Sequence, residues 1–369
     1  MSASDTSASD RPGALREIGA AFLRLGLLGF GGPAAHVALM RDELVRRRRW
    51  VSDRELLDLL AVANMLPGPN STELAMHLGR ARAGGWGLAV AGAAFIVPAA
   101  LLTAAVAWAY VTYGALPEVR AVLHGVQPVM LAIVAQAVVS LSRSALTDTY
   151  RIVLAVAVVA AASFGGNEIV LLIGGGVVMA MLGAARSRMR VVEPISLLAL
   201  AGIFLKIGAV LYGSGYVLLA YLREDLVERT GWLTDAQLLD AIVAGQATPG
   251  PILSTATFIG YVLAGPAGAV VSTVAIFLPA FLFVAASGPL LARVRRSASL
   301  SSALDRLVVA SLGLMAVVAV ELARTALVDP LTIVLFAIAL AFAVRTRVNA
   351  AWLIGAGAIA GLAASFVRL

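Results

Sequence analysis

The sequence contains no cysteine, which excludes disulfide bonds and thiolate metal sites. It is also poor in charge, because 13% of its residues are charged, whereas a typical soluble domain has about 25%. Hydrophobic residues make up 60% of the 369 positions, and a soluble core of this size cannot cover that much apolar surface. These proportions predict a protein whose solvent is largely lipid.

Two catalytic signatures are absent as well. No Gly-x-x-x-x-Gly-Lys-Ser/Thr sequence occurs, so the chain is not a P-loop ATPase, and no His-Glu-x-x-His zinc motif is present. The start of the chain is rich in Ser and Asp and lacks the basic and then apolar order of a signal peptide. We expect residues 1–16 to form a disordered tail.

Several apolar runs carry one charge or none and are close to 20 residues long, which is enough for a helix to cross about 30 Å of hydrocarbon. The clearest are Trp86–Tyr113, Val122–Leu141, Ile195–Leu222, Val262–Leu291 and Ala350–Val367. They are continuous rather than alternating, so they predict transmembrane helices and not a barrel. The predicted fold class is an all-α polytopic membrane protein.

The chain contains an internal repeat. Residues 22–72 align without gaps with residues 204–254, and about a third of the aligned positions are identical. The matches include Trp50 with Trp232 and the Pro-Gly-Pro run at 67–69 with that at 249–251. Chance similarity between apolar helices would instead match mostly Leu, Val and Ala. We therefore predict two homologous halves, residues 17–190 and 191–369.

The charges of the matching loops predict that the halves face opposite ways. The loop after the first span, residues 41–49, is net positive, whereas its copy at 223–229 is net negative. Because positive residues favour the cytoplasm, the first loop is expected inside and its copy outside. Five crossings per half, with each Pro-Gly-Pro segment dipping in and returning, give an inverted repeat of about ten transmembrane helices in the inner membrane.

Two kinds of interrupted helix recur at matching places in the halves. Proline and glycine end or unwind a helix, and a helix that restarts presents free N–H groups and a positive dipole end, which suits an anion. Close packing alone is the alternative explanation. The candidate substrate-binding residues are Gly31, Gly32, Pro33, Pro67, Gly68, Pro69, Asn70, Ser71 and Thr72 in the first half, and Gly213, Ser214, Pro249, Gly250, Pro251, Ser254 and Thr255 in the second.

Two basic residues, Arg24 and Lys206, lie inside apolar runs at the same repeat position. Charges within a membrane are costly and are usually functional. Two cations related by a two-fold axis would suit a dianion, so both residues join the candidate binding set. Alternatively, Arg24 reaches the nearby interface with its long side chain.

Four titratable residues are candidates for carrying a coupling proton: Glu73, His36, Asp58 and Asp240. Glu73 directly follows the Asn-Ser-Thr run, and His36 lies close to the first helix break. Asp58 and Asp240 match each other in the repeat, but both also suit the first turns of helices. Trp50 and its copy Trp232 are expected to anchor the chain at the membrane surface.

These motifs resemble the signatures of the chromate ion transporter family in its long, two-domain form. The resemblance rests on Phe30–His36, on the basic loop that ends at Trp50, on Leu66–Glu73, and on Gly245–Pro251 in the second half. It covers roughly residues 18–325 and implies chromate efflux driven by the membrane potential or a proton gradient, and chromate resistance. It implies no cofactor and no metal, and it directs attention to the Gly31–Pro33 and Pro67–Thr72 segments.

Three alternatives stay open at this point. The substrate could be sulfate or another tetrahedral oxyanion, and the protein could import or exchange it. An intramembrane hydrolase using Ser214 is disfavoured, because all three histidines lie in the other half. A receptor or scaffold would not need paired helix breaks. No nucleic-acid partner is indicated, and a homodimer is neither required nor excluded.

Overall fold

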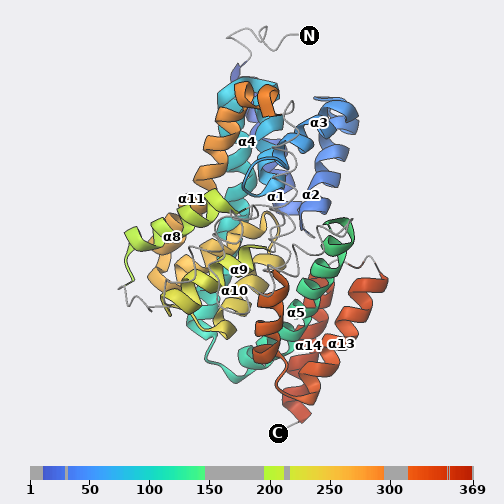
Figure 1. Ribbon diagram of the computed structural model, residues 1–369, viewed down its shortest axis with the longest axis vertical. Coiled ribbons are helices and arrows are strands. Elements are labelled where there is room, and N and C mark those ends of the chain that lie inside the picture. Colours follow the sequence, from blue (N-terminus) through green and yellow to red (C-terminus); the bar gives the residue numbers. More distant parts are fainter. Residues whose placement is uncertain are drawn as a thin grey trace, which may run out of the picture. The chain divides into compact units, whose positions relative to one another are not determined.

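The computed structural model describes residues 11–29, 32–145, 195–211, 217–294, 315–346, 348 and 350–367. Every regular element among them is helical, which confirms the all-α expectation (Figure 1). The first half contains α1 (Arg11–Leu28), α2 (Gly32–Met40), the π-helical η1 (Arg41–Arg47), α3 (Asp53–Ala63), α4 (Asn70–Tyr113) and α5 (Pro117–Ala145). The second half contains α8 (Leu197–Val210), α9 (Leu218–Leu222), η3 (Arg223–Arg229), α10 (Asp235–Ala247), η4 (Ile252–Ser254), α11 (Thr255–Val294), α13 (Pro330–Arg345) and α14 (Ala350–Val367).

These helices form two compact units, and each unit draws on both halves of the sequence. The first unit comprises Met1–Trp108, Leu197–Leu211 and Ala244–Arg296, and in it α8 packs along α11. The second comprises Ala109–Ser196, Tyr212–Val243 and Ser297–Leu369, and in it α5 packs against α13 and α14. Neither half therefore forms a unit by itself.

Three of the described helical segments are long and apolar enough to cross a membrane: Asn70–Tyr113, Pro117–Ser140 and Ile252–Ser287. Shorter apolar helices run over Leu197–Val210, Pro330–Arg345 and Ala350–Phe366. Two further short apolar stretches of the sequence, at 152–165 and 168–184, lie outside the described residues. The chain is thus a multi-pass helical membrane protein, and the count of about ten crossings stays a prediction.

Both α4 and α11 are helical hairpins rather than straight rods. The backbone of α4 turns at Ala83 and Gly84, and that of α11 turns at Ala264 and Gly265 with nearly the same dihedral angles. We call residues 70–83 and 84–113 the first and second arms of α4, and residues 255–264 and 265–294 those of α11. In each hairpin a glycine pair, 79 with 87 and 260 with 268, lets the two backbones touch.

The same local structure recurs at matching positions of the two predicted halves. Arg41 donates to Asp53 at 2.6 Å in the first half, and Arg223 donates to Asp235 at 2.9 Å in the second. In both cases the arginine opens a π-helical turn and the aspartate opens the helix that follows, α3 or α10. The loop between them therefore has one fold in both copies, although its net charge differs.

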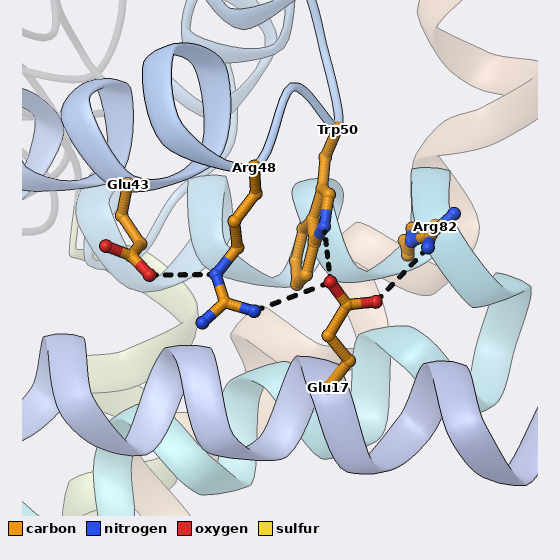
Figure 2. A network of polar contacts seen from close by, with 5 residues as sticks. All are labelled: Glu17, Glu43, Arg48, Trp50 and Arg82. Carbon is orange, nitrogen blue, oxygen red and sulfur yellow. Dashed lines mark hydrogen bonds and ion pairs between the residues drawn. The ribbon is translucent and has the colours of Figure 1, made fainter.

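The chain of the first half comes back to α1 twice, and Figure 2 shows the contacts that Glu17 of α1 makes with the returning segments. The carboxylate of Glu17 accepts hydrogen bonds from Arg48 at 3.4 Å, Trp50 at 3.1 Å and Arg82 at 3.2 Å. Arg48 and Trp50 follow η1, and Arg82 ends the first arm of α4. The chain therefore leaves the neighbourhood of Glu17 along α1 and returns to it at the end of η1. It leaves again through α3 and returns along the first arm of α4.

This geometry refines two expectations from the sequence. The apolar stretch before the basic loop is two short helices that turn back at the break near Gly29, because glycine and proline interrupt the helix there. Residues 11–16 belong to α1, so the helix begins before the expected end of the tail at residue 16. Pro12 suits a first helical turn, and the side chain of Ala14 is buried.

The two halves exchange contacts inside the first unit. A Cβ atom on Gly68 would lie 3.4 Å from the Ala280 Cβ, and one on Gly250 would lie 2.5 Å from the Ala99 Cβ. Gly68 matches Gly250 in the repeat, and Ala99 follows Gly87 by the same interval as Ala280 follows Gly268. Each Pro-Gly-Pro glycine therefore packs on the long second arm of the other half.

The second arms of α4 and α11 run antiparallel. Gly92 lies against the ring of Phe281. Nearer the turn of α4, Leu88 shares a buried cluster with Val284, which lies nearer the end of α11. Arg80 beside the same turn donates to the carbonyl of Val284 at 2.6 Å. These contacts bring the second arms of the two hairpins side by side within the first unit.

Candidate functional site

Three interrupted segments meet at the backbone carbonyl of Gly29. This oxygen accepts one hydrogen bond from Nε2 of His36 at 2.8 Å and another from the backbone N–H of Gly250 at 2.8 Å. Nδ1 of the same imidazole lies 3.1 Å from Oγ of Ser71. The break after α1, the start of α4 and the second Pro-Gly-Pro run are therefore joined within the first unit.

His36 is firmly seated at this junction. It projects from α2, its side chain is 2% exposed, and its ring meets the ring of Phe95 edge-on at 5.3 Å between centroids. A carbonyl oxygen only accepts, so Nε2 carries a hydrogen and the ring orientation is fixed by two bonds. The pattern in the sequence made His36 a candidate but did not indicate its partners, which are 7 and 35 residues away.

The start of α4 has the features of an anion-binding helix end. The N–H groups of Thr72 and Glu73 both bond to the carbonyl of Pro69, so the first turn closes directly on the Pro-Gly-Pro run. Thr72 is fully buried, and its Oγ1 has no hydrogen-bond partner in the structure. The Asn70 side chain donates to Asn64 at 2.7 Å. Asn70–Thr72 therefore lie together, and Thr72 retains an unused donor.

Glu73 is the most unusual side chain of this region. It is 0% exposed, and neither carboxyl oxygen has a hydrogen-bond partner in the structure. Its Oε1 reaches back to Gly68 and occupies the space that a Cβ atom at position 68 would fill. An ionised carboxylate is expensive in such a place unless a cation or a proton joins it. The role of Glu73 as a proton carrier stays a prediction.

The matching segment of the second half is less polar. Ser254 is 1% exposed and its Oγ has no hydrogen-bond partner in the structure, whereas Thr255 donates internally to the carbonyl of Ile252 at 2.8 Å. Pro249, Gly250 and Pro251 are all buried. Of this half's candidates, Gly250 has a direct bond to the first half and Ser254 keeps an unused hydroxyl.

The remaining candidates are placed as follows. Arg24 is exposed on α1, and Lys206 is half-buried on α8. Pro67 is half-buried, Pro69 is buried, Gly32 opens α2, and Pro33 is exposed in its first turn. Gly31, Gly213 and Ser214 lie outside the described residues. The roles given to these residues stay predictions.

The two matched aspartates differ in their surroundings. Asp58 is exposed on α3. Asp240 is 6% exposed and accepts hydrogen bonds from Tyr110 at 2.9 Å and from Gln127 at 2.8 Å. All three of the latter residues belong to the second unit, whereas Glu73 and His36 belong to the first. The four proton candidates do not form one cluster within a single unit.

The Glu17 network in Figure 2 was not predicted as a unit from the sequence. Burial raises the pKa of Glu17, but hydrogen bonds from Arg82 and Trp50 and the charges of Arg82 and Arg48 outweigh it and lower that pKa overall. Arg48 also donates to Glu43 at 2.8 Å. The sequence signal for this network was an acidic residue just before an apolar run that is followed by an arginine-rich loop.

No group of three potential metal ligands occurs among the described residues. What they do contain is interrupted helices with buried polar starts, packed against long apolar helices. This combination defines a polytopic membrane transporter, in which irregular backbone at membrane depth is tolerated because it is enclosed by protein.

The chain belongs to the chromate transporter family, whose profile matches it twice, at residues 16–181 and 198–362. It is 32% identical over 392 residues to a chromate transport protein of Pseudomonas aeruginosa, covering 96% of this chain and 94% of that one. It is 29% identical over 373 residues to the chromate transport protein of Cupriavidus metallidurans, covering 95% and 93%. A probable chromate transport protein of Synechococcus elongatus is 31% identical over 349 residues, with 88% and 89% covered. No solved structure matches the chain significantly.

Family membership confirms the resemblance found in the sequence. It also establishes the chain as a transporter rather than an enzyme, which removes the hydrolase and scaffold alternatives.

Proposed function

We propose that the protein exports chromate across the inner membrane, driven by the proton gradient or the membrane potential, and so confers chromate resistance. The observation that carries this proposal is the start of α4, where Thr72 keeps a buried, unused hydroxyl beside a helix N-terminus. Such a place offers fixed donors to a tetrahedral oxyanion without requiring a charged cage.

Binding would use the donors around the first Pro-Gly-Pro run. The anion is held by the first N–H groups of α4, by the hydroxyl of Thr72 and by Asn70, once Asn70 leaves Asn64. Ser254 contributes the corresponding hydroxyl from the second half. Lys206 and Arg24 supply positive charge in this proposal. The small residues of the two Pro-Gly-Pro runs let the backbone approach the anion.

The coupling proton would be carried by Glu73. A dianion that enters next to a buried carboxylate is favoured when that carboxyl is protonated, because like charges in a poorly hydrated site repel strongly. Proton binding and anion binding are then mutually dependent, so the proton crosses with the anion, and the membrane potential drives their net negative charge outward. Asp240, the repeat counterpart of Asp58, is the proton candidate in the second unit.

For the membrane topology, we propose an inverted repeat. The support is the reciprocal pair of contacts, Gly68 with Ala280 and Gly250 with Ala99, together with the antiparallel second arms of α4 and α11. A two-fold axis in the membrane plane reverses matching helices, whereas an axis along the membrane normal leaves them parallel. The opposite charges of the matching loops agree with the first arrangement.

The decisive experiment is uptake of labelled chromate by inside-out membrane vesicles from expressing cells. We expect saturable uptake that requires a proton gradient or membrane potential and that a protonophore reduces. Vesicles from cells with an empty vector provide the baseline. No saturable chromate uptake would refute the export proposal, and stronger uptake of sulfate than of chromate would assign the site to sulfate or a related oxyanion.

A further inference from the structure

The junction at Gly29 constrains where the hydrogens of Ser71 and His36 can be. The Gly29 carbonyl accepts from both Nε2 of His36 and the N–H of Gly250, so both of its lone pairs are occupied by donors. Nε2 of a neutral His36 therefore carries the ring hydrogen, and Nδ1 is an acceptor. The hydroxyl of Ser71, 3.1 Å away, must then donate to Nδ1.

With this assignment, Ser71 cannot donate a hydrogen bond to an anion while His36 is neutral. A serine hydroxyl has one hydrogen, and with that hydrogen turned to His36, Ser71 presents only lone pairs to any anion at the start of α4. When His36 takes up a second proton, Nδ1 becomes a donor and the bond reverses. The Ser71 hydrogen is then free to turn to the anion, and the positive imidazolium lies behind it.

We propose that His36 and Ser71 form a proton-operated relay in which uptake of one proton by the imidazole switches the Ser71 hydroxyl into a donor for the transported oxyanion. The relay rests on the proposed function and adds a specific proton-linked contact to it. His36 is a positioning residue here, because it acts on the anion through Ser71. The chemistry requires only that one proton binds the ring and that two hydrogen bonds exchange direction.

The surroundings of the ring suit such a relay. The elements packed against it are the end of α1 through Gly29, the first arm of α4 through Ser71, and the second arm through Phe95. The titratable groups on these elements within the first unit are Arg11, Arg16, Glu17 and Arg24 on α1, and Glu73, His77, Arg80 and Arg82 on the first arm. No hydrogen bond or ion pair among the described residues joins any of them to the ring, so an arriving anion is its natural counter-charge.

The relay also links the two halves. The same carbonyl that fixes Nε2 receives the N–H of Gly250, whose neighbours Pro249 and Pro251 cannot donate from their own nitrogens. A movement that separates the second Pro-Gly-Pro run from Gly29 frees one lone pair of that oxygen and loosens the ring. The state of Ser71 therefore depends on how the halves are packed, as an alternating transporter requires.

The test is anion binding as a function of pH with the full-length protein in lipid nanodiscs. Labelled sulfate and labelled chromate are the probes, and the slope of affinity against pH is compared between the unaltered protein and His36→Gln. Comparing the same anion in both proteins cancels the titration of chromate itself. We expect the unaltered protein to bind sulfate more tightly as pH falls, by up to about tenfold per pH unit for each linked proton, one of which is taken up by His36.

His36→Gln is expected to bind with a markedly smaller slope, because the amide can donate to Gly29 but does not titrate. Ser71→Ala keeps the ring and its bond to Gly29, so it should fold and should show the same loss of slope. Ser287→Ala removes a buried hydroxyl that bonds the Val284 carbonyl at 2.7 Å, and should keep the full slope.

The outcomes separate the relay from the proposed function. Unchanged slopes in both His36→Gln and Ser71→Ala, with anions still bound, would overturn the relay and leave the export proposal standing. A properly folded unaltered protein that binds neither anion would overturn both. Loss of slope in either variant while Ser287→Ala keeps it supports the relay.

Discussion

Glu17 and Arg82 are 65 residues apart in the sequence, yet Arg82 donates a hydrogen bond to the Glu17 carboxylate at 3.2 Å. The bond ties the turn of the α4 hairpin to the beginning of α1. The chain between these two residues, which includes the first Pro-Gly-Pro run, therefore leaves one surface and returns to it.

Removing the charge of Glu17 should loosen this tie. Glu17→Gln is expected to lower stability by about 1 kcal/mol or less, because the side chain is partly solvated and such ion pairs are screened. The measurement is the apparent melting temperature of the purified protein. Glu118→Gln, an exposed change on α5, is the matched control. Equal melting of both variants and the unaltered protein would show that the network adds no stability.

Acid should act on the same network. The pKa of Glu17 is lowered from its ordinary value of 4.5, so the stabilisation is fully present above about that pH and is lost as the pH falls through the lowered pKa. The difference in melting temperature between the unaltered protein and Glu17→Gln should therefore shrink below about pH 4.5. A difference that grows on acidification would contradict this assignment.

The unused hydroxyl of Thr72 should matter for transport. Thr72→Val keeps the shape of the side chain but removes the donor, and the loss of a hydrogen bond to a charged group corresponds to about 1.5–3 kcal/mol, roughly 10- to 100-fold in affinity for chromate. Vesicle uptake at several chromate concentrations measures it. Thr257→Val, which removes a buried hydroxyl that bonds Thr273 on the other arm of α11, should transport normally. Equal affinity in both variants would exclude Thr72 from the site.

Glu73→Gln should separate transport from its proton linkage. The neutral amide resembles the protonated carboxyl, so chromate transport should persist while its dependence on pH weakens. Glu118→Gln again serves as the control, and membrane abundance is checked by immunoblot. A pH dependence of transport that is unchanged in Glu73→Gln would remove this residue from the coupling mechanism.

The second Pro-Gly-Pro run leaves no room for a side chain. Gly250 has φ of +98°, and an added Cβ would lie 2.5 Å from that of Ala99, so Gly250→Ala should cost about 1–3 kcal/mol or prevent assembly. Gly202→Ala on α8 meets nothing within 4 Å and should be neutral or slightly stabilising. Thermal unfolding of both variants checks this, and a stable Gly250→Ala protein would show that the segment can move aside.

The topology can be read with single cysteines, because the chain has none of its own. Ala81 and Ala267 are exposed alanines beside the turns of α4 and α11. An impermeant thiol reagent should label Ala81→Cys from the cytoplasmic side, with the basic loop, and Ala267→Cys from the outside. Labelling of both from one side would mean that the halves are parallel.

The local breaks of the fold were predictable from the sequence, because proline and glycine act on the backbone of their own helix. The Pro-Gly-Pro runs and the repeat were visible for this reason, and so was the unusual character of Ser71–Glu73. The hairpin turns at Gly84 and Gly265 fall within or beside apolar runs. The sequence signal for these turns was the recurrence of glycines at 79 and 87 and at 260 and 268. Only two packed helices would place the glycines of each pair against one another.

The partners across the fold were not predictable. Nothing near His36 in the sequence indicates that its ring bonds Gly29 and that Gly250, in the other half, bonds the same oxygen. The repeat even misleads at Asp58 and Asp240, which match in sequence but differ in burial, since each half packs against different neighbours. Long-range contacts follow from packing, and an internal repeat fixes only the parts of the packing that both copies share.

Gly68 packs on Ala280 of the second half, and Gly250 packs on Ala99 of the first half. Each repeat therefore relies on the other for part of its packing. A gene cut between the repeats should therefore yield two fragments that are unstable alone and complement each other when made together. By the same reasoning, an ancestral single repeat that inserted in both orientations could pair with a second copy of itself. Gene fusion would later let the two copies diverge into a more polar half and a less polar half.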